Sequence, residues 1–119
     1  MNEEVSPLKL GIITNPPAVT LVYQTKLGKE RQRVMPVRIL NKFGPVDNIV
    51  KDLQERHTQY LEKVPLLRLE KMLRILQETS KGRNVEEAIN NISKDYNIDP
   101  NEDLNKVSDE DLAKKKRLM

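Results

Sequence analysis

The sequence predicts an α+β fold, mainly α, in which an N-terminal β-hairpin packs on a small helical bundle and a C-terminal helical segment follows. Three observations support this prediction. Two short strand-like runs, the first of them rich in Val, Leu, Tyr and Thr, lie within residues 18–40, and apolar stripes at helical spacing follow within residues 45–97. Residues 99–119 then repeat a helix-capping pattern. The 119 residues fit one domain, or one domain with a tail.

The domain organisation expected from these patterns has three parts. Residues 1–17 are expected to be irregular, because Pro7, Gly11 and the pair Pro16–Pro17 interrupt them and each proline removes a backbone donor. Residues 18–98 form the hairpin and three helices, and residues 99–119 form an acidic-then-basic helical tail.

The hairpin follows from two strand-like runs around a polar turn. Residues 18–25 read AVTLVYQT and residues 31–40 read RQRVMPVRIL, with Gly28 in the turn between them. Pro36 cannot donate a hydrogen bond to a neighbouring strand, so the second strand is expected at an edge of the sheet or at a bulge. Because an isolated hairpin is marginally stable, the helices must cover it.

The second strand also provides candidate partner contacts. Arg33, Met35 and Arg38 lie in and beside an apolar run, and both Arg and Met are enriched in the cores of protein interfaces. An exposed strand edge can also accept a further strand. The alternative is that this face packs on the helices and leaves its arginines in water.

Three helices are expected after the hairpin. The first begins near Val46, and Pro65 starts the second, which should end near Gly82 because glycine accepts the left-handed conformation there. Asn84 is expected to cap the third helix, with Glu87 in capping-box position. The apolar stripes comprise Ile49, Val50, Leu53, His57, Tyr60 and Leu61, then Leu66, Leu69, Met72, Leu73 and Leu76, then Val85, Ala88, Ile89, Ile92 and Tyr96.

The tail has helix-start signals but few large apolar residues. Residues 101–106 and 109–114 repeat one pattern, NEDLNK and DEDLAK. Too little apolar surface is available for independent folding, so the tail must dock on the domain, bind a partner or stay loose. Asp103, Leu104 and Leu112 are therefore further candidate partner contacts.

The residue inventory argues against catalysis. The chain has no cysteine and one histidine, His57, which is interpreted as a packing or surface residue. No glycine-rich phosphate loop is present, and the acidic residues at 99–111 lack the central glycine and final glutamate of a calcium loop. We therefore expect no enzymatic activity, metal site or cofactor.

The charge distribution gives weak support to polyanion binding. The net charge is +3, and residues 1–44 hold seven Lys and Arg against three Glu. The basic run 114–117 is typical of a solvated helix end, although contact with nucleic acid or a membrane surface stays open. The scarcity of aromatic side chains argues against stacking on single-stranded bases, and no nucleic acid is expected as a partner.

The N-terminal residues and the lack of cysteine indicate a cytoplasmic protein. Glu3 and Glu4 lie where a secretory signal would be basic and then apolar. No run approaches the roughly 18 apolar residues that a membrane span requires, so no transmembrane segment is expected.

Several specific strings resemble one known family. They are Pro16–Pro17, Leu21, Tyr23, the octapeptide Arg31–Arg38 (RQRVMPVR), Tyr60–Glu62 (YLE), Leu69–Lys71 (LEK), Ile98–Lys106 (IDPNEDLNK) and Asp111–Lys116 (DLAKKK). In these strings the sequence resembles the 19-kilodalton centrosomal protein family, from Gly11 to Met119. Residues 44–58 and 77–97 resemble the family in pattern more than in letters.

The resemblance implies a function that composition does not. Members of this family are implied to sit at the centrosome, on the mother centriole and ciliary basal body, where larger centrosomal scaffold proteins recruit them. They capture a Rab-like small GTPase in its GTP state, which engages intraflagellar transport machinery and promotes ciliogenesis. The implied function is thus that of a non-catalytic adaptor.

Alternatives to this function stay open from the sequence. Family members continue into a further charged tail, so the GTPase contacts are expected either within residues 1–119 or in that tail. A basic microtubule- or nucleic-acid-binding module is a rival function, and a purely structural centriolar component is another.

Overall fold

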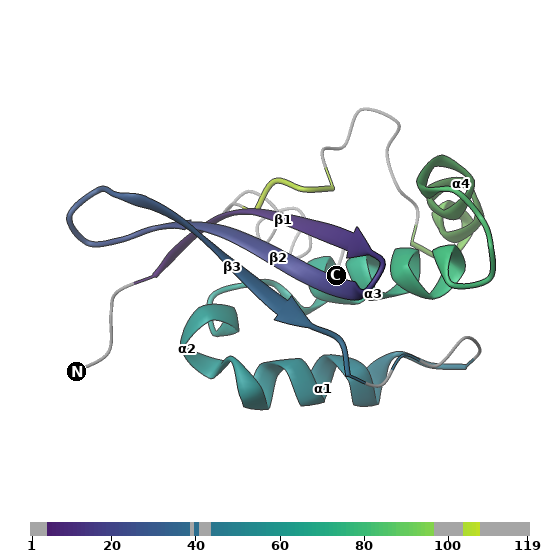
Figure 1. Cartoon of the computed structure of the whole chain (residues 1–119), viewed down its shortest axis with the longest axis horizontal. Coiled ribbons are helices and arrows are strands. Elements are labelled where there is room, and N and C mark those ends of the chain that lie inside the picture. Colours follow the sequence, from purple (N-terminus) through teal and green to yellow (C-terminus); the bar gives the residue numbers. More distant parts are fainter. Residues whose placement is uncertain (1–4, 39, 41–43, 97–103, 108–119) are drawn as a thin grey trace.

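The computed structural model describes residues 5–38, 40, 44–96 and 104–107. Within them, a three-stranded antiparallel sheet is followed by four helices, which confirms the α+β class (Figure 1). The elements are β1 (Ser6–Thr14), β2 (Pro17–Gln24), β3 (Glu30–Pro36), α1 (Asp47–Arg56), α2 (Thr58–Leu61), α3 (Leu66–Thr79) and α4 (Val85–Tyr96).

The first strand corrects the expectation of an irregular N-terminal segment. Residues expected to be irregular form β1, which pairs with β2, so the sheet has three strands in the order β1-β2-β3 instead of the two of a hairpin. Gly11 fits inside this strand for a steric reason, because a Cβ there would lie 2.7 Å from Thr20 Oγ1 on β2. The turn Asn15–Pro16, whose peptide bond is cis, joins the two strands. Gly11 therefore belongs to a strand and Pro16 to the turn that follows it, and neither residue indicates an irregular segment.

The predicted hairpin is present as β2 and β3. Gly28 has φ of 83° in the connecting turn, and the Thr25 amide donates to the Lys29 carbonyl at 2.8 Å. β3 is an edge strand and Pro36 is its last residue, which confirms the position inferred from proline chemistry.

The helices begin and end near the residues predicted for them, with one difference. Asn84 Oδ1 accepts a hydrogen bond from the Glu87 amide at 2.8 Å, so the predicted cap of α4 is confirmed. Pro65 immediately precedes α3, and Gly82 lies just beyond its end with φ of 94°. The first stripe, however, is divided between α1 and α2, because His57 adopts φ of −130° between them.

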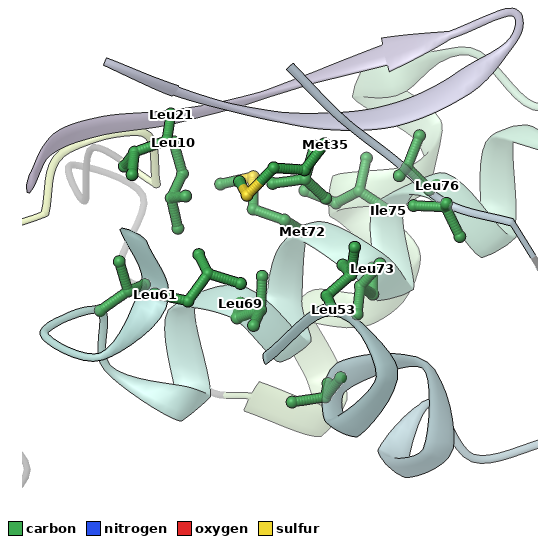
Figure 2. Close-up of a cluster of buried hydrophobic side chains, with 14 of the residues drawn as sticks. Leu10, Leu21, Met35, Leu53, Leu61, Leu69, Met72, Leu73, Ile75 and Leu76 are labelled. Atoms are coloured by element: carbon green, nitrogen blue, oxygen red, sulfur yellow. The ribbon is translucent and has the colours of Figure 1, made fainter. Parts of the chain in front are cut away.

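The core lies between the sheet and α3. This helix is central, since it contacts β1, β2, α1 and α4. Figure 2 shows side chains of the sheet meeting those of α3, with α1 and α2 closing the other side. The labelled residues are Leu10, Leu21, Met35, Leu53, Leu61, Leu69, Met72, Leu73, Ile75 and Leu76, each at most 3% exposed.

The described part of the expected tail helix is not helical. Residues 104–107 form a turn and an extended bridge along β1, with Lys106 opposite Lys9. The Leu10 amide donates to the Asn105 carbonyl at 2.6 Å, and the Val107 amide donates to the Leu8 carbonyl at 2.9 Å. This part of the tail docks on the domain. The rest of the predicted helix, at 99–103 and 108–119, lies outside the described residues.

Candidate interaction surface

A cluster of side chains joins β3 to the junction of α1 and α2. Arg33 Nε donates to His57 Nδ1 at 3.3 Å, and the Arg33 guanidinium lies 4.1 Å from the centroid of the Tyr60 ring. Tyr60 in turn contacts Tyr23 of β2 edge to face, with ring centroids 5.4 Å apart. The alternation of β3 directs Arg33 to this helix-facing side, and the break between α1 and α2 places His57 opposite it.

A second arginine ties the end of β3 to α1. Arg56 Nη2 donates to the Pro36 carbonyl at 2.9 Å and to Asp52 Oδ2 at 2.8 Å. Arg56 is in the last turn of α1, where a cation is also favoured by the helix dipole. The contact satisfies a backbone acceptor at the edge of the sheet.

The surroundings of His57 disfavour the protonated form of its imidazole. Its residue is 9% exposed, and burial lowers the pKa of its imidazole, as do the positive charges of Arg33, Arg56 and Arg38, with Asp52 opposing them. Because Nδ1 accepts from Arg33, the proton of the neutral ring is on Nε2. That nitrogen is buried without a hydrogen-bond partner. The histidine is thus a structural acceptor beside a basic surface, consistent with the packing role expected for it.

A different buried charge joins α3 to α4. Burial favours the neutral form of Glu78, but hydrogen bonds from Asn91, Lys81 and Arg83 outweigh it, so the pKa of this carboxyl lies below its usual value. The Tyr96 hydroxyl donates to Glu70 Oε1 at 2.9 Å, and burial together with this contact raises the pKa of Tyr96. Glu78 and Tyr96 thus have hydrogen-bond partners within the fold, and these contacts stabilise the packing of α3 against α4.

The structure divides the sequence-predicted contact residues. Arg33 is partly buried in the His57 cluster and Arg38 is exposed beside it. Met35 is fully buried under the sheet and Leu104 is 8% exposed against β1, so these two side chains pack in the core of the described fold.

The other two predicted contacts, Asp103 and Leu112, lie outside the described residues. Sequence reasoning missed Arg56 and Tyr60, which complete the cluster. The only signal for Arg56 was its place near the end of an amphipathic helix.

The described cluster offers positive charge and hydrogen-bond donors, which suit binding of carboxylates. Among the residues that the structure describes, no three His, Cys, Asp or Glu side chains are grouped so as to hold a metal ion. None of the helices in that part of the chain has the length and apolar character to cross a membrane.

Comparison with known sequences identifies the family. A family model described as CEP19-like protein matches residues 8–119. The chain belongs to the CEP19-like protein family. The resemblance inferred from the sequence strings is therefore confirmed.

Relatives of this CEP19-like chain carry one name. A Homo sapiens protein named Centrosomal protein of 19 kDa is 42% identical over 114 residues, which cover 93% of this chain and 70% of the relative. Its namesakes from Rattus norvegicus and Danio rerio are 41% and 33% identical over 114 residues each, with 93% of this chain and 70% and 69% of those proteins covered. No solved structure matches this CEP19-like chain.

Proposed function

We propose that this protein is a non-catalytic adaptor of the centrosome, positioned on the mother centriole and ciliary basal body. It captures a Rab-like small GTPase in the GTP state and so brings intraflagellar transport machinery to the ciliary base, while large centrosomal scaffold proteins hold it there. The observation that carries this proposal is the CEP19-like family match over residues 8–119, together with the name Centrosomal protein of 19 kDa borne by relatives up to 42% identical.

The geometry supports an adaptor because its charged groups are arranged for binding. Arg33 and Arg38 lie at one surface with Arg56, and the His57 imidazole beside them accepts a hydrogen bond from Arg33. A general base needs a free nitrogen within reach of a substrate proton. The described His57 nitrogens are both buried or bonded, which supports a role for this cluster in recognition rather than in proton transfer.

Burial divides the proposed contact residues into two groups. Met35 and Leu104 fill the core, so within the fold their side chains act through stability. Arg33 and Arg38 are the surface residues that we propose for partner contact, and Asp103 and Leu112 stay in the proposal from the sequence strings alone.

Calorimetry tests the GTPase arm of this proposal. The 119-residue chain is titrated with the Rab-like GTPase loaded with a GTP analogue or with GDP, and binding at least about 10-fold tighter in the GTP-analogue state is expected, since switch segments order around the γ-phosphate. Arg38→Glu should weaken this binding, whereas Lys63→Glu makes the same charge change at an exposed site between α2 and α3 and should not. Equal affinity for the two nucleotide states would contradict GTP-selective capture, and absence of binding would exclude residues 1–119 as sufficient for it.

A further inference from the structure

Alternate residues of β3 turn their backbone hydrogen-bonding groups away from β2. The Thr25 amide donates to Lys29 and the Val37 amide donates to Pro17, so these two pairs are hydrogen-bonded pairs of the antiparallel ladder. The register carries the same parity through the hairpin. The backbone hydrogen-bonding groups of Arg31, Arg33 and Met35 therefore point inward, toward β2. Those of Glu30, Gln32, Val34 and Pro36 point outward, away from β2.

The outward edge of β3 is open over most of its length. At its end the Pro36 carbonyl is already bonded to Arg56. The backbone groups of Glu30, Gln32 and Val34 on this side have no hydrogen-bond partner among the residues that the structure describes. We call Glu30–Val34 the open edge. It offers the donors and acceptors on which an added strand would pair.

The opposite edge of the sheet, formed by β1, is paired with an extended segment from another part of the chain. On β1 the outward groups of Leu8 and Leu10 are bonded to Val107 and Asn105, from a part of the chain far away in sequence (Figure 1). The chain therefore covers the β1 edge there with its own residues, while the open edge of β3 has no such cover among the described residues.

The side chains around the open edge select the chemistry of an occupant. Arg31 and Arg33 project on the helix-facing side of β3, whereas Glu30, Gln32 and the half-exposed Val34 project on the other side, so positive charge lies on one face of the edge. Arg38 and Arg56 add positive charge at the Pro36 end, and Asp52 is already paired with Arg56. A second copy of β3 would set arginines against arginines, which is unfavourable across paired strands.

We propose that the open edge binds an extended acidic segment of a partner protein as a fourth strand of the sheet. The segment places carboxylates beside Arg31 and Arg33 and a small apolar side chain beside Val34. This inference deepens the proposed adaptor function and rests on it only in that an adaptor requires a docking surface. The probe used below contains no GTPase, so the two proposals can fail separately.

A model peptide provides the direct test. The probe is a capped peptide of about six residues that alternates Glu and Val, a length matched to the open edge, and its control replaces each Glu by Lys. Each is titrated into the ¹⁵N-labelled 119-residue chain. The acidic peptide should shift the amide signals of Gln32 and Val34, with a Kd below about 1 mM at low salt, and the binding should weaken as salt is added. The basic peptide should bind at least about 10-fold more weakly.

Two variants separate backbone pairing from charge. Gln32→Pro removes an outward donor without touching the ladder to β2, and Gln32→Ala is the matched control that keeps the donor. The proline variant should lose about 5-fold in affinity and the alanine variant less than about 2-fold, since a hydrogen bond contributes about 1 kcal/mol net. Arg31→Glu keeps every backbone donor and should reverse the preference from the acidic to the basic peptide.

Three outcomes would overturn the proposal. The first is no binding of the acidic peptide up to about 1 mM, or shifts that leave out Gln32 and Val34. The second is equal binding by the proline and alanine variants when their unfolding midpoints and β2 amide signals show an intact fold. The third is a dimer in sedimentation equilibrium that Gln32→Pro dissociates, because the occupant of the edge would then be a second copy of this chain.

Discussion

Met35 and Val34 are neighbours in the sequence that the structure places on opposite faces of β3. Met35 is fully buried against α3, while Val34 is 50% exposed on the other face. Truncation to alanine should therefore have very different effects at the two positions. Met35→Ala leaves a cavity below the sheet, and Val34→Ala removes side-chain atoms that already contact water.

The expected magnitudes follow from burial. Replacing a buried methionine by alanine costs about 2–5 kcal/mol in free energy of unfolding, because both transfer energy and a cavity contribute. Methionines are adaptable, and Met35 lies beside Met72, so the lower half of this range is expected here (Figure 2). About 3 kcal/mol would lower the midpoint of thermal unfolding by roughly 10 °C for a chain of this size. Val34→Ala should cost less than about 1 kcal/mol.

Urea denaturation followed by circular dichroism measures both changes. The slope of free energy against urea should stay constant, so that the shift of the midpoint reports stability alone. A loss below about 1 kcal/mol for Met35→Ala, or an equal loss for Val34→Ala, would refute the assignment of Met35 to the core and would return it to the surface contacts expected from the sequence.

Three further predictions concern α4, the His57 cluster and the tail. Asn84→Ala should lower the free energy of unfolding by about 1 kcal/mol in urea denaturation, because the Glu87 amide loses its cap; no change would show that the cap is not stabilising. The pKa of His57 lies below 6.5 in the fold, so the unfolded chain binds the proton first, and the free energy of unfolding should fall as pH drops below about 6.5 until the folded pKa is passed. His57→Asn should make this pH dependence smaller, and an unchanged profile would assign it to other groups. Leu104→Asp should release the bridge to β1 and speed hydrogen exchange of the Leu10 amide, whereas undiminished protection would mean that the bridge does not depend on Leu104 burial.

The Arg33 side chain is held in place by His57 and Tyr60. Its guanidinium is bonded to His57 and stacked on Tyr60, so the side chain is ordered before any partner arrives. A pre-ordered arginine loses less conformational entropy on binding a carboxylate than a freely rotating one does.

The sequence predicted elements whose signals are local. Proline and glycine at Pro65 and Gly82 restrict φ or permit its left-handed value, and Asn84 satisfies an amide three residues away, so each mark could be interpreted without tertiary structure. The hairpin of β2 and β3 was likewise predictable, because strand-like runs flank one short turn. The missing donor of Pro36 limited its strand to an edge or a bulge, and the structure places Glu30–Pro36 at an edge.

The candidate site could be predicted only in part. The alternation of β3 put Arg33 and Met35 on the same face, and the structure agrees. It could not show that this face turns toward α3, where Met35 is buried while Arg33 reaches the rim of the core at His57. Which side chains of one face stay accessible depends on where the covering helices end, and that is a property of packing.

By itself the sequence determined the α+β class, the hairpin, the bounds of α3 and the cap of α4, because these depend on residue type and on contacts between near neighbours. Only the tertiary structure decided that β1 is a strand, that residues 104–107 pair with it, and that none of the described residues pairs with the outer edge of β3. The physical reason is that a strand is stabilised by hydrogen bonds to another strand. The partner of Leu10 in the tail lies almost a whole chain length away, at Asn105, where no local pattern could indicate it.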